Sequence, residues 1–362
     1  MMNQLKSRQI CFFFIAFIPI IKLFTLPSVL AEICAEDMWL SACLNVFLDG
    51  LTVFTLAMVC RKTKTDFYGL LKLNFGEVVA KIIFGLYFVF FLMKSILPIA
   101  EQKDYVEITL YETQPSIFTF LPFFIVSFYL CLKKLRAFGR CADIMWVCSV
   151  SGLLVLFALS VGNVDFGAIL PVGARGIKNI STGFFRAVTW FCDGAYMLFF
   201  VGKFQYKAKD VVKITASYFL STVCVIVFMI FFYGIFTSIS KRQLYALPEM
   251  SKYTTVINNI GRFDYIGIIL VLFSGVFSLS APLYFATYCL KKIFGFKKSV
   301  IPSAIVNAVV FAIFLFVTEK FANIRDFITN YGSVYFILLG NVVPLLLPLL
   351  LIKQKGESYE SA

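Results

Sequence analysis

The chain has 362 residues, of which 60% are hydrophobic and 15% are charged, and its formal net charge is +13. Ordinary soluble domains contain about 25% charged residues. The composition, with a mean hydropathy of +0.88, therefore excludes a soluble globular protein and predicts an all-α polytopic membrane protein. The basic residues form short clusters between apolar runs, so the charge does not indicate a nucleic-acid-binding protein.

Residue types that commonly bind metals or act as general bases are scarce. The chain has no histidine, and its ten cysteines are scattered without a CxxC pair. We therefore predict no metal site and no cofactor, and we expect the cysteines to serve as small apolar residues in helix packing. A membrane enzyme would need a clustered nucleophile and base. The sequence shows no such cluster, so an enzyme is not expected.

Apolar segments recur along the whole chain, and a helix that crosses a bilayer needs about 20 residues. These segments predict a single transmembrane domain over residues 1–362, with a first half of five spans over 10–161 and a second half over 184–352. The ten predicted spans are 10–31, 39–60, 78–99, 115–133, 141–161, 184–203, 211–235, 265–290, 300–318 and 332–352.

The orientation follows from lysine and arginine in the connections, because these residues are enriched on the cytoplasmic side. Basic clusters such as 133–140 fall in every second connection, whereas all charged residues of the first outer connection, 32–38, are acidic. Both termini are therefore predicted to be cytoplasmic. A signal peptide cleaved near SVLAE (28–32) is the competing interpretation, but Lys22 and two prolines interrupt its apolar core.

Two of the predicted spans contain residues that interrupt helices. The first holds IPIIKLFTLP (18–27), with a lysine and two prolines, and the sixth holds TWFCDGAY (189–196). Proline removes a backbone donor and clashes with the preceding turn, and glycine allows unusual backbone angles. Interrupted spans at matching positions of two halves are typical of transporters built as a LeuT-like 5+5 inverted repeat, whose ligand binds beside the breaks.

Three ionisable residues are predicted at mid-membrane depth, namely Lys22, Asp49 and Asp193. A buried charge is unfavourable unless it is paired or hydrated. We expect Lys22 to pair with Asp193 or Asp49 beside a polar cavity. In the alternative, Lys22 extends toward the interface, Asp49 fills a local packing defect and Asp193 faces water. Lys94, nearer the outer edge, is expected to extend toward the interface as well.

Polar residues on other spans are weaker candidates for ligand contacts. Ser274 and Ser278 lie in FSGVFSLSAP (273–282) and could line a pathway, although small polar residues in membrane helices usually serve packing. Tyr87 is a candidate aromatic lid, and Trp190 could pack on a ligand.

Several stretches, in this order, carry a resemblance to a known family. They are SRQ (7–9), Pro27, GRCADIMW (139–146), DFGAILPVGARGIKNISTG (165–183), INNIGRFDYIGIIL (257–270) and NVVPLLLPLLLI (341–352). With these stretches the whole chain resembles the B subunits of GerA-type spore germinant receptors. These are endospore germination permeases of the amino acid–polyamine–organocation superfamily.

The resemblance implies a LeuT-type fold with a pocket between spans 1, 3, 6 and 8. It implies a small amino-acid-like germinant and partner subunits of the A and C types. The location would be the spore inner membrane or the cell membrane of a spore-forming bacterium. The amino ends of the half-helices would hold the ligand's carboxylate, and the freed backbone carbonyls would hold its ammonium group. Together with the residue patterns above, it gives these ligand-binding candidates: Lys22, Phe24, Thr25, Tyr87, Trp190, Cys192, Asp193, Gly194, Ser274 and Ser278.

Each of the two predicted breaks departs from the family pattern. Lys22, Leu23 and Phe24 stand where members usually carry glycine or another small residue, and Asp193 stands where many carry glutamate. A lysine at the break would crowd or charge the pocket, which favours an acidic ligand or a subunit that has lost ligand binding. The predicted function is ligand sensing within a germinant receptor, and the alternatives are an amino acid transporter of the same fold or a purely structural subunit.

Overall fold

The computed structural model describes residues 5–110, 116–204, 206–252, 264–317 and 321–349, and no strand occurs among them. The helices, in chain order, are α1 (Ser7–Ile20), α2 (Leu26–Cys34), α3 (Met38–Lys62), α4 (Phe67–Leu110), α5 (Ser116–Leu132), α6 (Leu135–Ser160), α7 (Gly176–Ala187), α8 (Ala195–Leu198), α9 (Ala208–Phe236), α10 (Ala246–Lys252), α11 (Asp264–Phe294), α12 (Val300–Val317), α13 (Phe321–Tyr331) and α14 (Ser333–Ile337). The all-helical prediction is confirmed.

Length and apolar composition identify fewer crossing helices than the ten predicted. Within the described ranges, five segments qualify, and a sixth is added if a pair of helices bent by 61° near Gly332 counts as one span. The helices α1, α5 and α12 are apolar but shorter than a full crossing. The broken first span explains part of the difference, because neither of its halves crosses a bilayer alone.

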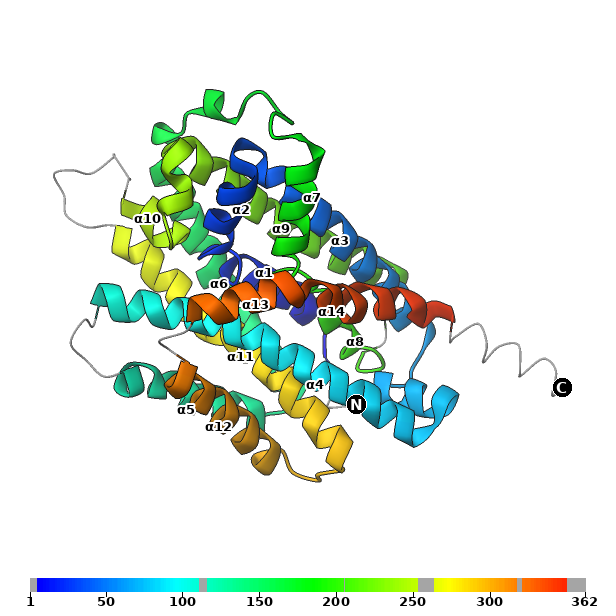
Figure 1. Ribbon diagram of the computed structural model, residues 1–362. Coiled ribbons are helices and arrows are strands. Elements are labelled where there is room, and N and C mark those ends of the chain that lie inside the picture. The colour runs from blue at the N-terminus through cyan, green and yellow to red at the C-terminus, as the bar shows by residue number, and fades with distance from the viewer. Residues whose placement is uncertain (1–4, 111–115, 205, 253–263, 318–320, 350–362) are drawn as a thin grey trace.

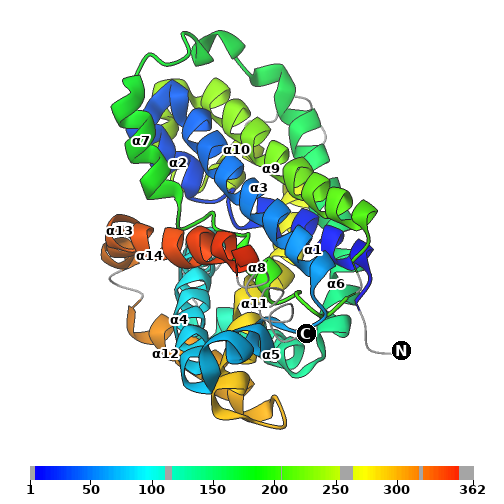
Figure 2. The same ribbon diagram turned by 90° about the vertical axis from the view of Figure 1, so that its right-hand side faces the viewer.

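The longest helices pack in two groups that share α11. Helices α4 and α11 run side by side, and α5 with α12 lies along their outer edge (Figure 1). Helix α1 packs against α6, α9 and α11, while α3 packs against α9 and α7. The view turned by 90° shows α7 standing beside α2 and α3 (Figure 2).

Aromatic rings fill the space where α1, α8 and α11 meet. The Tyr196 ring lies 4.7 Å from that of Phe17 and 5.3 Å from that of Phe285, both edge to face, a favourable arrangement for aromatic pairs. Large apolar side chains also point outward, such as Phe47, which is 70% exposed. An outward apolar surface of this kind suits contact with lipid.

One carboxylate ties together three segments at the start of α4. Asp66 Oδ2 accepts hydrogen bonds from Lys203 Nζ at 3.4 Å, from Lys292 Nζ at 3.0 Å and from the Tyr288 hydroxyl at 3.3 Å. Its Oδ1 accepts the Gly69 amide at 2.9 Å, which caps the helix. Burial alone would raise the pKa of Asp66, but the two lysines outweigh it and lower that pKa below its ordinary value.

Replacing Asp66 by asparagine is expected to reduce the free energy of unfolding by about 1–2 kcal/mol at pH 7. A lowered pKa in the folded state means that the contribution is present above the unfolded-state pKa, near 4, and is lost as the pH falls through the folded-state pKa. Thermal unfolding from pH 7 to pH 3 should therefore show the difference from wild type shrinking below pH 4. The matched variant Asp326→Asn, with a side chain that is 53% exposed, should change the melting temperature little.

Candidate functional site

Both interrupted spans are broken where the sequence predicts. Helix α1 ends at Ile20, and α2 begins at Leu26, with Pro27 in its first turn, where a missing backbone donor does no harm. Helix α7 ends at Ala187, and the next helical turn begins only at Ala195. Cys192, between them, has a φ of +64°. Residues other than glycine seldom adopt this left-handed backbone conformation.

Four buried charges meet between these breaks. Lys22 Nζ forms an ion pair with Asp193 Oδ2, and Lys94 Nζ lies 2.9 Å from Asp193 Oδ1. Asp49 Oδ2 accepts the backbone N–H of Asp193 at 2.9 Å. Two lysines and two aspartates give this cluster, hereafter the charge cluster, a formal charge of zero. Buried ions of one sign would be strongly unfavourable, so the balance is what allows the group inside the bundle.

The expectation that Lys94 extends to the interface is wrong. Its side chain is 2% exposed, and its ammonium donates to the Phe191 carbonyl as well as pairing with Asp193. The unwound segment supplies both acceptors inside the bundle, so Lys94 has stronger partners there than at the edge. Lys22 and Asp193 are also fully buried, which contradicts the alternative in which they reach the interface or water.

A second polar contact joins the two breaks. Glu101 is 1% exposed, and its Oε1 accepts the Thr25 hydroxyl at 2.5 Å and the Trp190 indole N–H at 3.0 Å. Thr25 belongs to the first break and Trp190 to the second, so one carboxylate holds both. Sequence reasoning missed Glu101, because α4 continues well past the predicted end of its span at residue 99.

The carbonyl groups freed by the first break are bonded by backbone from a distant loop. The carbonyls of Leu23 and Phe24 accept the N–H groups of Leu247 at 3.0 Å and Ala246 at 2.8 Å, at the start of α10. The Phe24 ring also packs on Tyr105 at 5.9 Å. Irregular backbone at membrane depth is tolerated when protein satisfies it in this way.

The unwound part of the second break packs tightly against two neighbouring segments. The Asn341 side-chain amide donates to Cys192 Sγ at 3.1 Å, and its oxygen accepts the Thr52 hydroxyl at 2.8 Å. A Cβ at Gly194 would lie 2.6 Å from Thr52 Cγ2. Only glycine therefore allows this close approach to α3.

The remaining sequence candidates have partners elsewhere. The Ser278 hydroxyl lies 3.2 Å from the Ala16 carbonyl of α1 and 3.1 Å from that of Ser274, which fits the packing interpretation of these serines. The Tyr87 hydroxyl donates to the Leu339 carbonyl at 2.8 Å. Tyr87 is thus anchored to the segment that follows α14.

Replacing Glu101 by alanine is expected to lower the free energy of unfolding by about 2–4 kcal/mol, because the Thr25 hydroxyl and the Trp190 indole would be left buried without an acceptor. Glu101→Gln keeps an oxygen at this position and should lose clearly less. Thermal unfolding of both variants measures the difference. Equal loss in the two variants would contradict the bridging role of this oxygen.

Comparison with known proteins gives a family and a fold. The model of the spore germination protein family (Spore_permease) matches residues 4–323, whereas no curated protein matches the chain significantly. The crystal structure of the Eremococcus coleocola manganese transporter with an aromatic bis-isothiourea substituted compound is similar, with a TM-score of 0.56, 11% identity and coverage of 94% of this chain and 78% of the transporter. A glutamate-to-glutamine mutant of that transporter gives a TM-score of 0.57 at 12% identity, with the same coverage.

Identities this low show a shared transporter-like fold and nothing finer. The family match covers most of the chain, from the start of α1 into α13. The helical architecture, the outward apolar surface and the two broken segments agree with a membrane permease. The chain belongs to the spore germination protein family.

Proposed function

We propose that this protein is the ligand-sensing membrane subunit of a spore germinant receptor, and that a small amino-acid-like germinant binds beside the two breaks. The charge cluster is the observation that carries the proposal. It places two ammonium groups and two carboxylates between discontinuous helices, where transporters with broken helices bind their ligands.

The charge balance of the cluster favours a zwitterionic ligand. A zwitterion can exchange partners with the cluster, its carboxylate facing Lys22 or Lys94 and its ammonium facing Asp193 or Asp49, without adding net charge. Asp49 Oδ1 has no hydrogen-bond partner among the described residues, so it can accept an ammonium N–H. An acidic ligand, which Lys22 alone would favour, would leave one negative charge uncompensated in a buried site.

Signalling would arise from a bias between two arrangements of the breaks. The ligand would take over contacts that now join Lys22 and Lys94 to Asp193. Its differential affinity for the two arrangements would supply the free energy. Partner subunits of the A and C types would receive the change. The ten-span, LeuT-like 5+5 order with both termini in the cytoplasm belongs to the same proposal.

A thermal-unfolding screen of the full chain in detergent tests the proposal. A zwitterionic amino acid at about 100 times its Kd should stabilise the wild type by about 2.7 kcal/mol, and Lys22→Gly should reduce the shift. The matched control is Lys241→Gly, an exposed lysine in a 3-10 helix, which should keep the shift. Absence of a shift in wild type, with a shift in Lys22→Gly, would show that the lysine blocks the site and contradict sensing by this subunit.

An amino acid transporter of the same fold is the second candidate, and the similarity to a manganese transporter favours it. Both functions need a pocket and a gate. Uptake of a labelled amino acid into proteoliposomes containing this chain alone separates them. Ligand-dependent stabilisation without uptake supports sensing, whereas uptake that Lys22→Gly abolishes supports transport.

A further inference from the structure

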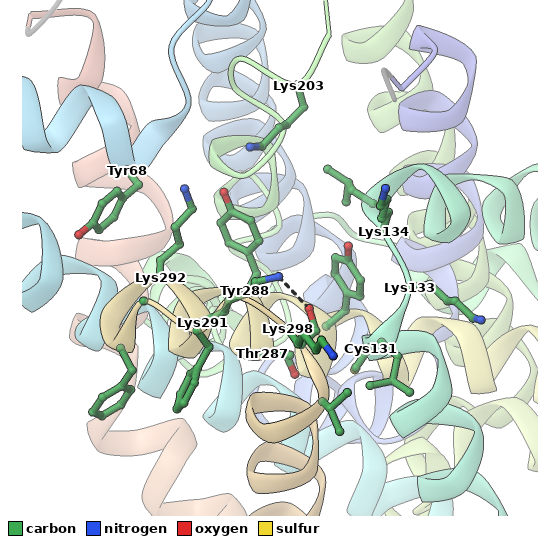
Figure 3. Close-up of a pocket in the computed structure, with 18 of the residues that line it drawn as sticks. Tyr68, Cys131, Lys133, Lys134, Lys203, Thr287, Tyr288, Lys291, Lys292 and Lys298 are labelled. Atoms are coloured by element: carbon green, nitrogen blue, oxygen red, sulfur yellow. Dashed lines mark hydrogen bonds between the residues drawn. The ribbon is translucent and has the colours of Figure 1, made fainter. Parts of the chain in front are cut away.

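A hollow separate from the charge cluster opens at the end of the bundle where α4 begins and α11 ends. Its volume is about 920 Å³, and its lining includes eight lysines and one glutamate. These lysines come from α4, from the turn before α6, from the segment after α8, and from the end of α11 with the loop that follows it. Figure 3 shows Lys203 and Lys292 on one side of the hollow and Lys134 on the other.

Few carboxylates offset this positive charge. Lys72 and Lys81 share Glu77, at 2.7 and 2.9 Å, while Lys203 and Lys292 share Asp66. Each of these pairs therefore retains one net positive charge.

The remaining lysines of the hollow have no carboxylate within ion-pair distance in the part of the chain that the structure describes. Lys134 and Lys298 are exposed, Lys291 donates to the Ser299 hydroxyl at 3.1 Å, and Lys133 lies 4.0 Å from the centre of the Tyr129 ring. With two paired carboxylates against eight lysines, the hollow carries an excess of six positive charges.

The general enrichment of lysine on the cytoplasmic side does not by itself produce such a hollow. That tendency distributes basic residues over connections, whereas here four separate segments direct them at one cavity. Aromatic residues line the same cavity. The ammonium nitrogens of Lys203 and Lys292 lie 5.6 Å and 5.8 Å from the centre of the Tyr288 ring. Rings beneath ammonium groups leave N–H donors free to point into the hollow.

We propose that this basic hollow binds a phosphate-bearing anion. A phosphate presents several acceptor oxygens and a concentrated negative charge, which several converging ammonium groups match. Two sources share this chemistry, the headgroup of an anionic phospholipid and a soluble phosphate compound. Basic pockets between membrane helices bind lipid headgroups for the same reason. The proposal is independent of the germinant site.

Titration of the purified full chain tests the proposal, with thermal unfolding as the readout. The probes are dioctanoyl phosphatidylglycerol, zwitterionic dioctanoyl phosphatidylcholine and inorganic phosphate. The pocket variant is Lys134→Gln with Lys298→Gln, because both side chains are exposed and neither has a described carboxylate partner. The control is Lys209→Gln with Lys297→Gln, which removes two exposed lysines outside the lining.

We expect an anionic probe to bind the wild type and the control alike, and the pocket variant to bind about tenfold more weakly. Raising the salt concentration should weaken the same binding. Binding of phosphatidylglycerol but not phosphate identifies a lipid headgroup as the source, and pocket-dependent binding of phosphate identifies a soluble compound. Equal affinities in the pocket and control variants, or no binding of either anionic probe to the wild type, would overturn the proposal.

Discussion

Replacing Asp193 by asparagine is expected to lower the free energy of unfolding by about 3–5 kcal/mol, the range found when one partner of a buried ion pair is removed. The asparagine would leave Lys22 and Lys94 buried beside each other, with Asp49 as the one remaining carboxylate of the cluster. Thermal unfolding of the detergent-purified variant, together with its abundance in the membrane fraction, measures the effect.

The cause of that loss can be separated from a general packing defect. Asp193→Asn leaves two ammonium groups against the single carboxylate of Asp49, so the cluster carries one excess positive charge. Adding Lys22→Met removes that excess, and Lys94 still has the Phe191 carbonyl. The double variant should therefore recover at least half of the lost stability. Glu249→Gln, which breaks a more exposed pair with Lys252, should cost no more than about 1 kcal/mol. A double variant less stable than Asp193→Asn alone would rule out charge imbalance as the cause.

Replacing Gly340 by alanine is expected to destabilise the protein by about 1–3 kcal/mol through overpacking. A Cβ at this position would lie 2.4 Å from Cys192 Cβ and 2.7 Å from its sulfur, so the unwound segment of the second break would have to shift. The same change should weaken any ligand response that depends on this segment. Unfolding temperature and the ligand-dependent shift are measured together.

Cys192→Gly provides the rescue for this variant. It removes the atoms that the new methyl group would strike, and it places glycine at a φ of +64°, where side chains are disfavoured. The combination of Gly340→Ala with Cys192→Gly should be more stable than the sum of the single effects predicts. Gly85→Ala, where a Cβ would meet nothing within 4 Å, is the control and should be neutral or slightly stabilising. Additive effects at positions 340 and 192 would contradict direct contact.

Local sequence signals predicted the all-helical class and the positions of both breaks. Runs of apolar residues predict membrane helices because burying backbone in lipid requires helical hydrogen bonding. Prolines around Lys22 and the glycine after Asp193 predict interruptions because their effects on backbone angles act within a turn or two. Hydropathy predicts ten spans because it detects apolar runs. It does not detect where a helix ends, and α1, α5 and α12 are shorter than a full crossing.

The partners of the buried charges could be found only in the tertiary structure. Lys94 meets Asp193 across 99 positions of sequence, and Glu101 meets Trp190 across 89. The carbonyls of the first break are satisfied by residues 246 and 247, more than 200 positions away. Composition, periodicity and helix-breaking residues determined that the chain is a helical membrane protein broken at two places, because those properties depend on near neighbours. The pairing of the buried charges, and the loop that hydrogen-bonds the carbonyls of the first break, depended on packing between distant segments. A buried charge or a freed carbonyl takes whatever partner the fold brings within hydrogen-bond distance.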